Sequence, residues 1–335
     1  MAILLNLIII VAGIALVLWG ADRLTEGAAG IARRMSVPEI VIGLTIVAAG
    51  TSAPELFVSL VSALKGTPDM AVGNVVGSNI FNSLLIVGTA AVVTPMVITP
   101  ATAKKDIPCA VAASLLLAVL MMDDFTSLSI SGNMLGRFDG IVMLAGFVFF
   151  MIYTFKVAGS NKGEKATADA ESAADDGNSS EDAAPQMSIP KGALWILVGL
   201  ACLIIGSNLF VDNATAMATT LGVSQSVIGL TIVAGGTSLP ELATSVVAAR
   251  KGQSAIAIGN VIGSTVFNVL LILGTTAVIC PMQIGGITLV DVTTSLLAAA
   301  LLWLFSFTKF KLERWEGAVL LVVFTAYMAW LLHNL

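Results

Sequence analysis

Two glutamates, Glu55 and Glu241, are the residues best placed to do chemistry, because each lies deep within a long apolar stretch of the chain. A charged carboxylate in the middle of a bilayer costs roughly 3 kcal/mol or more, so it is expected to have a partner. Neither stretch contains a Lys or Arg at a matching depth. The missing partner is therefore predicted to be a mobile cation. The alternative is a protonated Glu that hydrogen-bonds a neighbouring helix.

The chain around each glutamate contains glycine and proline, in the sequences GTSAPE and GTSLPE. Pro54 and Pro240 have no N–H to bond the carbonyls four residues back, at Gly50 and Gly236. Both segments are therefore predicted to break there and to turn free backbone carbonyls toward a cavity. Four hydroxyls lie at the same depth and either add oxygen ligands or only satisfy the kinked backbone: Thr51, Ser52, Thr237 and Ser238.

A second motif supplies further hydroxyl and amide oxygens, as GNVVGSNIFN from Gly73 and GNVIGSTVFN from Gly259. In each copy a Ser and an Asn are four residues apart and share one face of a helix. These side chains are predicted to complete an oxygen cage, although the amides could instead join helices by hydrogen bonds. The four are Ser78, Asn82, Ser264 and Asn268.

Other amides of this motif are weaker candidates. Asn74 and Asn260 lie on the same helical face, and the favoured interpretation is that they hold helices together. Asn79 becomes Thr265 in the second copy, so it is not expected to be essential.

The candidate ligands are all hard oxygen donors. This set disfavours zinc, copper and nickel, which prefer thiolate or imidazole ligands. The only histidine, His333, is beside the end of the sequence, and the three cysteines show no CxxC pattern. Calcium takes about six to eight oxygens, and sodium also suits such a cage. Two carboxylates balance one Ca²⁺ or two Na⁺, so the two ions could compete for one site.

The composition indicates that these residues lie in a membrane. Hydrophobic residues make up 57% of the chain, charged residues 11%, and the mean hydropathy is +0.97, whereas about a quarter of the residues of a soluble domain are charged. Apolar runs of about 20 residues recur without the alternation of barrel strands, which predicts helices that cross a bilayer. Ten spans are expected, near 2–20, 37–65, 70–95, 106–122, 138–156, 191–211, 223–249, 254–280, 286–308 and 315–333.

An internal duplication relates the two halves of the chain. Residues 41–96 and 227–282 align at a constant offset of 186 residues, with 36 identities in 56 positions. Because each half holds five spans, an odd number, the second half is predicted to enter the bilayer in the opposite direction. The expected fold class is an all-α integral membrane protein of ten transmembrane helices, built as two inverted-topology repeats of five over 1–156 and 191–335.

The basic residues predict the orientation of the spans. Lys and Arg favour cytoplasmic flanks, and all but Lys65 and Arg137 of the 16 basic residues fall on one set of alternating flanks. Both termini are therefore expected outside the cell's inner (plasma) membrane, with residues 157–190 in the cytoplasm. This acidic segment is predicted to be a flexible loop, because it is too poor in apolar residues to bury a core. Its DDGNSSED sequence does not fit a calcium-binding EF-hand loop.

The paired motifs, GTSAPE with GNVVGSNIFN and GTSLPE with GNVIGSTVFN, resemble the repeats of the sodium/calcium exchanger family, in particular its prokaryotic, YrbG-like members. The resemblance implies a ten-helix exchanger in which sodium entry drives calcium export by alternating access. It implies that the ions are bound by the two glutamates, the four hydroxyls beside them and the Ser and Asn of each second motif, together with backbone carbonyls near Ala48 and Ala234. These ten side chains are Glu55, Glu241, Thr51, Ser52, Thr237, Ser238, Ser78, Asn82, Ser264 and Asn268. It also implies that two long helices, here 2–20 and 191–211, slide across the rest of the protein.

One position departs from part of that family. Potassium-dependent members carry Asp where this chain has Asn268, so the resemblance implies a potassium-independent exchanger. More than two sodium ions per calcium would make transport electrogenic.

Other functions are less well supported by the sequence. A Ca²⁺/H⁺ antiporter is the nearest alternative, because carboxylates in a low dielectric take up protons readily. A cation channel is a second, although a continuous pore does not need broken repeats around a fixed site. An enzyme is not expected, since HExxH and GxSxG motifs are absent. The expected partners are Na⁺, Ca²⁺ and the lipid bilayer, with no cofactor, no nucleic acid and no obligate protein partner.

Overall fold

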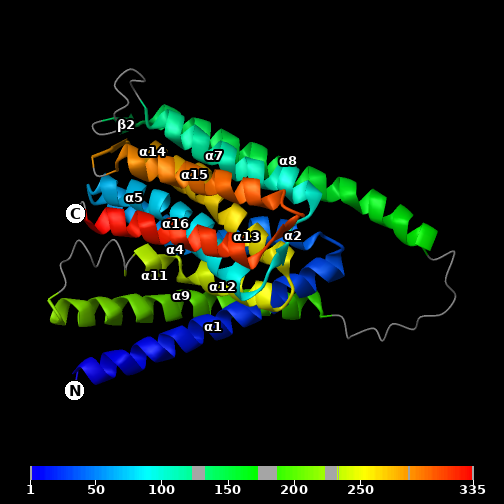
Figure 1. The fold of residues 1–335 in the computed structure, drawn as a ribbon, viewed down its shortest axis with the longest axis horizontal. Coiled ribbons are helices and arrows are strands. Elements are labelled where there is room, and N and C mark those ends of the chain that lie inside the picture. Colours follow the sequence, from blue (N-terminus) through cyan, green and yellow to red (C-terminus); the bar gives the residue numbers. More distant parts are fainter. Residues whose placement is uncertain are drawn as a thin grey trace.

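The computed structural model describes residues 2–122, 133–172, 187–222, 232, 234–285 and 287–333. Over these residues the protein is almost entirely helical, and its long helices run roughly along one common axis (Figure 1). In the described part of the chain, seven helices are long and apolar enough to cross a bilayer, and an eighth span results if the bent pair Glu39–Thr51 and Ala53–Leu64 counts as one. The chain is therefore an all-α membrane protein.

The first half contains α-helices interrupted by short π-helical segments, which carry the prefix η. They are α1 (Ala2–Met35), α2 (Glu39–Ile42), η1 (Gly43–Val47), α3 (Ala48–Thr51), α4 (Ala53–Leu64), α5 (Pro68–Ile80), η2 (Phe81–Ile86), α6 (Val87–Val93), η3 (Thr102–Asp106), α7 (Ile107–Leu120) and α8 (Arg137–Ser172).

The second half repeats much of this order. Its helices are α9 (Ile189–Thr220), α11 (Ala234–Thr237), α12 (Leu239–Arg250), α13 (Ser254–Val266), η5 (Phe267–Leu273), α14 (Gly274–Ile279), α15 (Leu289–Ser306) and α16 (Arg314–His333). The beginning of the expected span 223–249, residues 223–231, lies outside the described residues.

The first helix is longer than the expected span 2–20, because α1 continues to Met35. The charged residues that suggested a loop after residue 20 are paired within the structure. Arg23 pairs with Asp22 and lies 2.7 Å from Glu26, and Lys251 Nζ lies 2.6 Å from Asp22 Oδ1. Because these charges are paired, the chain after residue 20 continues as part of α1.

Two other helices also extend past their expected ends. α9 continues beyond residue 211 to Thr220, where the hydroxyls of Thr219 and Thr220 each bond a carbonyl four residues back, at 2.8 Å. α8 continues to Ser172, so the backbone of 157–172 is helical rather than a loop, in keeping with its content of Ala, Lys and Glu. Residues 173–186 lie outside the described residues, so the rest of the predicted loop stays a prediction.

The centre of the bundle is formed by the two stretches that carry the second motif. In Pro68–Val93 and Ser254–Ile279, 78% and 94% of the most apolar window is buried, against 22% in α1. Small residues permit this central position. A Cβ on Gly259 would lie 2.8 Å from Ile40 O, and one on Gly43 would lie 2.9 Å from Ile256 O. α13 therefore packs backbone to backbone against α2 and η1, in the small-residue manner of membrane helices.

α1 and α9 form a long antiparallel pair along one edge of the molecule (Figure 1). Glycines seven residues apart on each helix meet across the pair, with Gly13, Gly20 and Gly27 opposite Gly206, Gly199 and Gly192. A Cβ at each of the three α1 glycines would lie 2.6–2.8 Å from the carbonyl oxygen of its partner glycine. Any side chain at these crossings would push the helices apart, so the pair is joined along much of its length.

Two very short antiparallel strand pairs tie the halves together at the helix ends. β1 (Met96–Val97) pairs with β4 (Lys311–Leu312), and β2 (Met134–Leu135) pairs with β3 (Met282–Gln283). Each pair joins a segment of the first half to a segment of the second.

Candidate cation-binding site

The helix break at each glutamate is present, as the proline-containing motifs predicted. The chain bends by 45° between Glu39–Thr51 and Ala53–Leu64, and Ser52 at the break has φ −84° and ψ 6°. Ser238 stands at the same place in the second half, with φ −87° and ψ 4°. As a result Glu55 lies in the first turn of α4 and Glu241 in the first turn of α12. The N-terminal end of a helix is where its dipole favours a negative charge.

The two breaks lie against each other, and their side chains are hydrogen-bonded across the halves. Ser52 Oγ donates to Glu241 Oε1 at 3.0 Å, and Ser238 Oγ donates to Glu55 Oε1 at 3.4 Å. Ser264 Oγ also donates to Glu241 Oε1, at 3.4 Å, while Ser238 Oγ lies 3.3 Å from Ser78 Oγ. Six of the side chains named by the sequence therefore form two hydrogen-bonded groups of three, one around each glutamate, in which each glutamate contacts a serine of the other half. These two groups are called the cluster below.

The polar atoms of this cluster are buried but incompletely paired. Both glutamates are 1% exposed, and neither forms an ion pair within the described part of the chain. Oε2 of Glu55 and Oε2 of Glu241 have no hydrogen-bond partner among these residues, and the same holds for both amide atoms of Asn82 and for Oδ1 of Asn268. Buried polar atoms are nearly always paired, so these oxygens are suited to bind a cation.

The two asparagines lie where the helices are wound more loosely. Asn82 is in η2 and Asn268 is in η5, both π-helical, and each continues a helix whose last turns carry Ser78 or Ser264. Short π-helical segments inside α-helices occur frequently at functional sites. No group of three or more His, Cys, Asp or Glu side chains that could hold a metal is found in the described residues. An ion bound here would therefore depend on neutral oxygens besides the two carboxylates.

The backbone carbonyls at the breaks are less free than the prolines suggested. Ala48 O accepts from Ser52 N at 2.9 Å, and Gly50 O also accepts a backbone N–H at the end of α3. Gly236 O accepts from the hydroxyl of Ser207 on α9. The expectation of free carbonyls was wrong at Gly50 and Gly236, because nearby donors replace the bonds that proline removes. Each carbonyl keeps a second lone pair that remains available to a cation. The other expected carbonyl ligand, Ala234, is the first residue of α11.

Asn74 and Asn260 have the structural role that was favoured for them. Asn74 Nδ2 donates to Glu55 O at 3.3 Å and to Ser59 Oγ at 3.0 Å, and Asn260 makes the equivalent bonds to Glu241 O and Ser245 Oγ at 3.4 and 3.0 Å. The two serines were not singled out from the sequence. Their position four residues after each glutamate, in both copies, was the signal that could have found them.

Thr51 is tied into the same network. Its hydroxyl donates to Asn260 Oδ1 at 3.0 Å and approaches Ala48 O at 3.4 Å. A hydroxyl that donates a hydrogen bond keeps lone pairs for a cation, so this contact fixes Thr51 without excluding it as a ligand. Thr237, the equivalent residue, is also buried.

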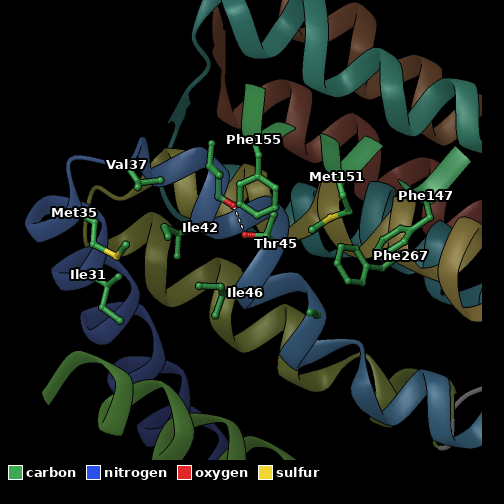
Figure 2. Close-up of a pocket in the computed structure, with 12 residues that line it drawn as sticks. Ile31, Met35, Val37, Ile42, Thr45, Ile46, Phe147, Met151, Phe155 and Phe267 are labelled. Carbon is green, nitrogen blue, oxygen red and sulfur yellow. Dashed lines mark hydrogen bonds between the residues drawn. The ribbon is translucent and has the colours of Figure 1, made fainter. Parts of the chain in front are cut away.

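A large apolar cavity lies elsewhere, between α1, the α2–η1 segment, α8 and η5 (Figure 2). Its volume is about 600 Å³ and its walls include Ile31, Ile46, Phe147, Phe155 and Phe267. Thr45 is its one polar side chain, and that hydroxyl bonds Val41 O at 2.6 Å. None of the predicted ligands lines this cavity, and its chemistry does not suit an ion.

Comparison with known proteins agrees with the chemistry of the cluster. The profile of the family described as "Sodium/calcium exchanger protein" matches residues 5–156 and 191–333. The chain belongs to the sodium/calcium exchanger family.

Its relatives span nearly the same length. The chain is 36% identical to "Putative antiporter CaxA" of Alkalimonas amylolytica, over 96% of each protein. It is 35% identical to "Inner membrane protein YrbG" of Escherichia coli (strain K12), over 84% of this chain and 82% of that one. It is 33% identical to "Sodium/calcium exchanger MaX1" of Methanosarcina acetivorans, over 97% and 98%.

A solved membrane exchanger has the same fold. The sodium-calcium exchanger NCX_Mj, from crystals soaked with Na⁺ and Ca²⁺, superimposes with a TM-score of 0.79 at 28% sequence identity, over 97% of this chain and 98% of that one. Members of this exchanger family are transporters, and the present chain shares their architecture.

Asn260→Ala is expected to lower the thermal stability of the detergent-solubilised protein more than Ser245→Ala. The first change removes one hydrogen-bond partner from each of three buried groups, namely the hydroxyls of Thr51 and Ser245 and the backbone carbonyl of Glu241. A buried group left unpaired costs about 1–3 kcal/mol. The second removes a single partner of Asn260. Unfolding monitored by tryptophan fluorescence measures the difference. Equal losses in the two variants would contradict the role of Asn260 as a link between the halves.

Proposed function

We propose that the chain is a secondary active Na⁺/Ca²⁺ antiporter that exports calcium by alternating access. The single observation that carries this proposal is how the carboxylate oxygens of the two glutamates are hydrogen-bonded. One oxygen of each is bound by a serine of the opposite half, and the other has no partner among the described residues. Two such carboxylates, which no Lys or Arg of the described residues pairs with, balance one Ca²⁺ or two Na⁺ and allow the ions to compete.

The proposed ligands are those expected from the sequence. Glu55 and Glu241 provide the charge, and neutral oxygens complete the coordination of about six to eight that calcium prefers. These are the hydroxyls and amides of Thr51, Ser52, Ser78, Asn82, Thr237, Ser238, Ser264 and Asn268, with the backbone carbonyls of Ala48 and Ala234. All the side chains in this set are buried.

We further propose ten spans arranged as two inverted repeats. Equivalent residues, 186 positions apart, make equivalent contacts on the two sides of the site, as Asn74 with Ser59 and Asn260 with Ser245 illustrate. A two-fold axis in the membrane plane accounts for these reciprocal bonds, and it is the architecture in which repeats exchange conformations.

The moving part in this proposal is the α1–α9 pair. Its glycine crossings join the two helices, and it packs on both breaks, because Cβ atoms on Gly50 and Gly236 would collide with Leu200 and Val211 of α9. Movement of this pair as one unit would alter access to both glutamates at once.

Several finer features belong to the same proposal. Transport is independent of K⁺, because Asn268 supplies no third carboxylate. It is electrogenic, with more than two sodium ions moved per calcium. The protein acts alone in the bilayer, without a cofactor or an obligate protein partner.

Flux in proteoliposomes tests the function. With Na⁺ inside and ⁴⁵Ca²⁺ outside, uptake of calcium should require the sodium gradient, continue in the presence of a protonophore and change little when K⁺ is added. A Ca²⁺/H⁺ antiporter would instead respond to a proton gradient without sodium, and a channel would pass calcium with neither gradient. A requirement for K⁺ on the calcium side would show that the inference from Asn268 is wrong.

The orientation is tested with reporter fusions. A reporter inserted within 160–185 should be cytoplasmic and one fused after Leu335 external, because 14 of the 16 basic residues lie on one set of flanks. Both chain ends lie at one end of the bundle, opposite the end where α8 finishes and α9 starts (Figure 1). A cytoplasmic reporter after Leu335 would contradict the ten-span arrangement.

A further inference from the structure

A hydrogen bond between two amides joins the halves beside the glutamate cluster. Asn268 Nδ2 donates to Asn79 Oδ1 at 3.1 Å, and both side chains are 1% exposed. Asn79 follows Ser78 near the end of α5, whereas Asn268 lies in η5 of the other half. Asn79 is therefore next to the cluster in sequence and in space, although it is not among the proposed ligands.

In the structure this bond turns the NH₂ group of Asn268 toward Asn79, whose own Nδ2 has no hydrogen-bond partner among the described residues. An asparagine amide can present its oxygen or its NH₂ group in a given direction, and only the oxygen can bind a cation. Because Nδ2 is held by Asn79, Oδ1 is directed away from that bond, and it has no partner among the described residues. Ser264, one helical turn before Asn268, donates to Glu241 Oε1. Asn268 thus lies on the helical face that carries the cluster, with its amide oxygen unpaired among the described residues.

The other half has no such arrangement. Thr265 stands where the first half has Asn79, and Asn82 is the counterpart of Asn268. The hydroxyl of Thr265 and both amide atoms of Asn82 have no hydrogen-bond partner in the described part of the chain. The Asn-to-Thr difference between the repeats therefore leaves Asn268 with an amide hydrogen bond and its counterpart Asn82 with none among the described residues.

We propose that Asn79 is a positioning residue that turns the Asn268 oxygen toward the transported divalent cation. The proposal rests on the function proposed above and adds an asymmetry to the site. An amide that is already oriented does not have to turn when the ion binds. Loss of Asn79 should therefore weaken calcium binding while the maximal transport rate changes little.

Three variants separate orientation from general packing. Asn79→Leu is close in shape but has no acceptor for the Asn268 amide. Asn79→Asp keeps an acceptor and should hold Asn268 as the wild type does. Thr265→Val is the matched control in the other half, since it removes a buried hydroxyl that bonds nothing described. Monodisperse elution and the unfolding temperature without calcium check that each variant is folded.

The decisive experiment is a double-mutant cycle on calcium affinity, measured by calorimetry of the detergent-solubilised full chain in sodium-free buffer. Asn79→Leu should weaken binding about tenfold, the effect of one hydrogen bond of ordinary strength. Asn79→Asp should keep at least part of the affinity, and Thr265→Val should bind as the wild type does. In an Asn268→Leu background, adding Asn79→Leu should change the affinity no further.

Two results would overturn this inference. One is wild-type affinity in Asn79→Leu, and the other is an equal loss from Asn79→Leu whether or not Asn268 is present. Either would leave the proposed function intact. A wild-type protein that binds no calcium would instead overturn the proposed function itself.

Discussion

The burial of two carboxylates, with no ion-paired basic side chain among the described residues, is the constraint on which the rest of the structure depends. Within a bilayer such groups need compensation, from hydrogen bonds together with either a bound cation or protonation. The protein provides the bonds from opposite halves, Ser52 to Glu241 and Ser238 to Glu55. It places each glutamate at the start of a helix and leaves one oxygen of each without a hydrogen-bond partner among the described residues. The breaks, the close helix packing and the π-helical segments all serve to bring these oxygens together.

Small residues determine how the other helices are arranged around this cluster. Glycines let α13 approach η1 closely, and they let α1 and α9 join along one edge. α9 also reaches the site directly, because Ser207 donates to Gly236 O at one break while Leu200 packs on Gly50 at the other. The edge pair thus contacts the cluster. α1 itself is largely exposed over its most apolar stretch, whereas residues farther along it, such as Leu24, Ala28 and Ala29, are buried. A rigid pair resting on a polar centre is a suitable geometry for gating access to it.

The sequence predicted the parts of this structure that follow from strong local chemistry. Proline before each glutamate predicted the breaks, the repeat predicted that two copies of the motif would meet, and apolar length predicted the helical spans. Helix ends were predicted less well. Arg23 was assigned to a flank of the first span, and only the structure shows that Asp22 and Glu26 pair with it inside α1. Contacts between distant residues were also missed. Ser207 satisfies Gly236 O from α9, and nothing in the local sequence of either residue indicates the bond.

Calcium binding by glutamine variants tests the central claim most directly. A carboxylate and a unit positive charge roughly 3 Å apart attract by about 5 kcal/mol at an effective dielectric of about 20, and even a third of this weakens binding by more than about tenfold. Glu55→Gln and Glu241→Gln should therefore fold, unfold at the same or a higher temperature without ions, and lose most calcium binding in calorimetry. Glu316→Gln is the control, because Glu316 is a buried carboxylate that bonds the backbone of Glu313 at the start of α16. Wild-type calcium affinity in both Glu55→Gln and Glu241→Gln would contradict the account, since the ion would then have to bind elsewhere.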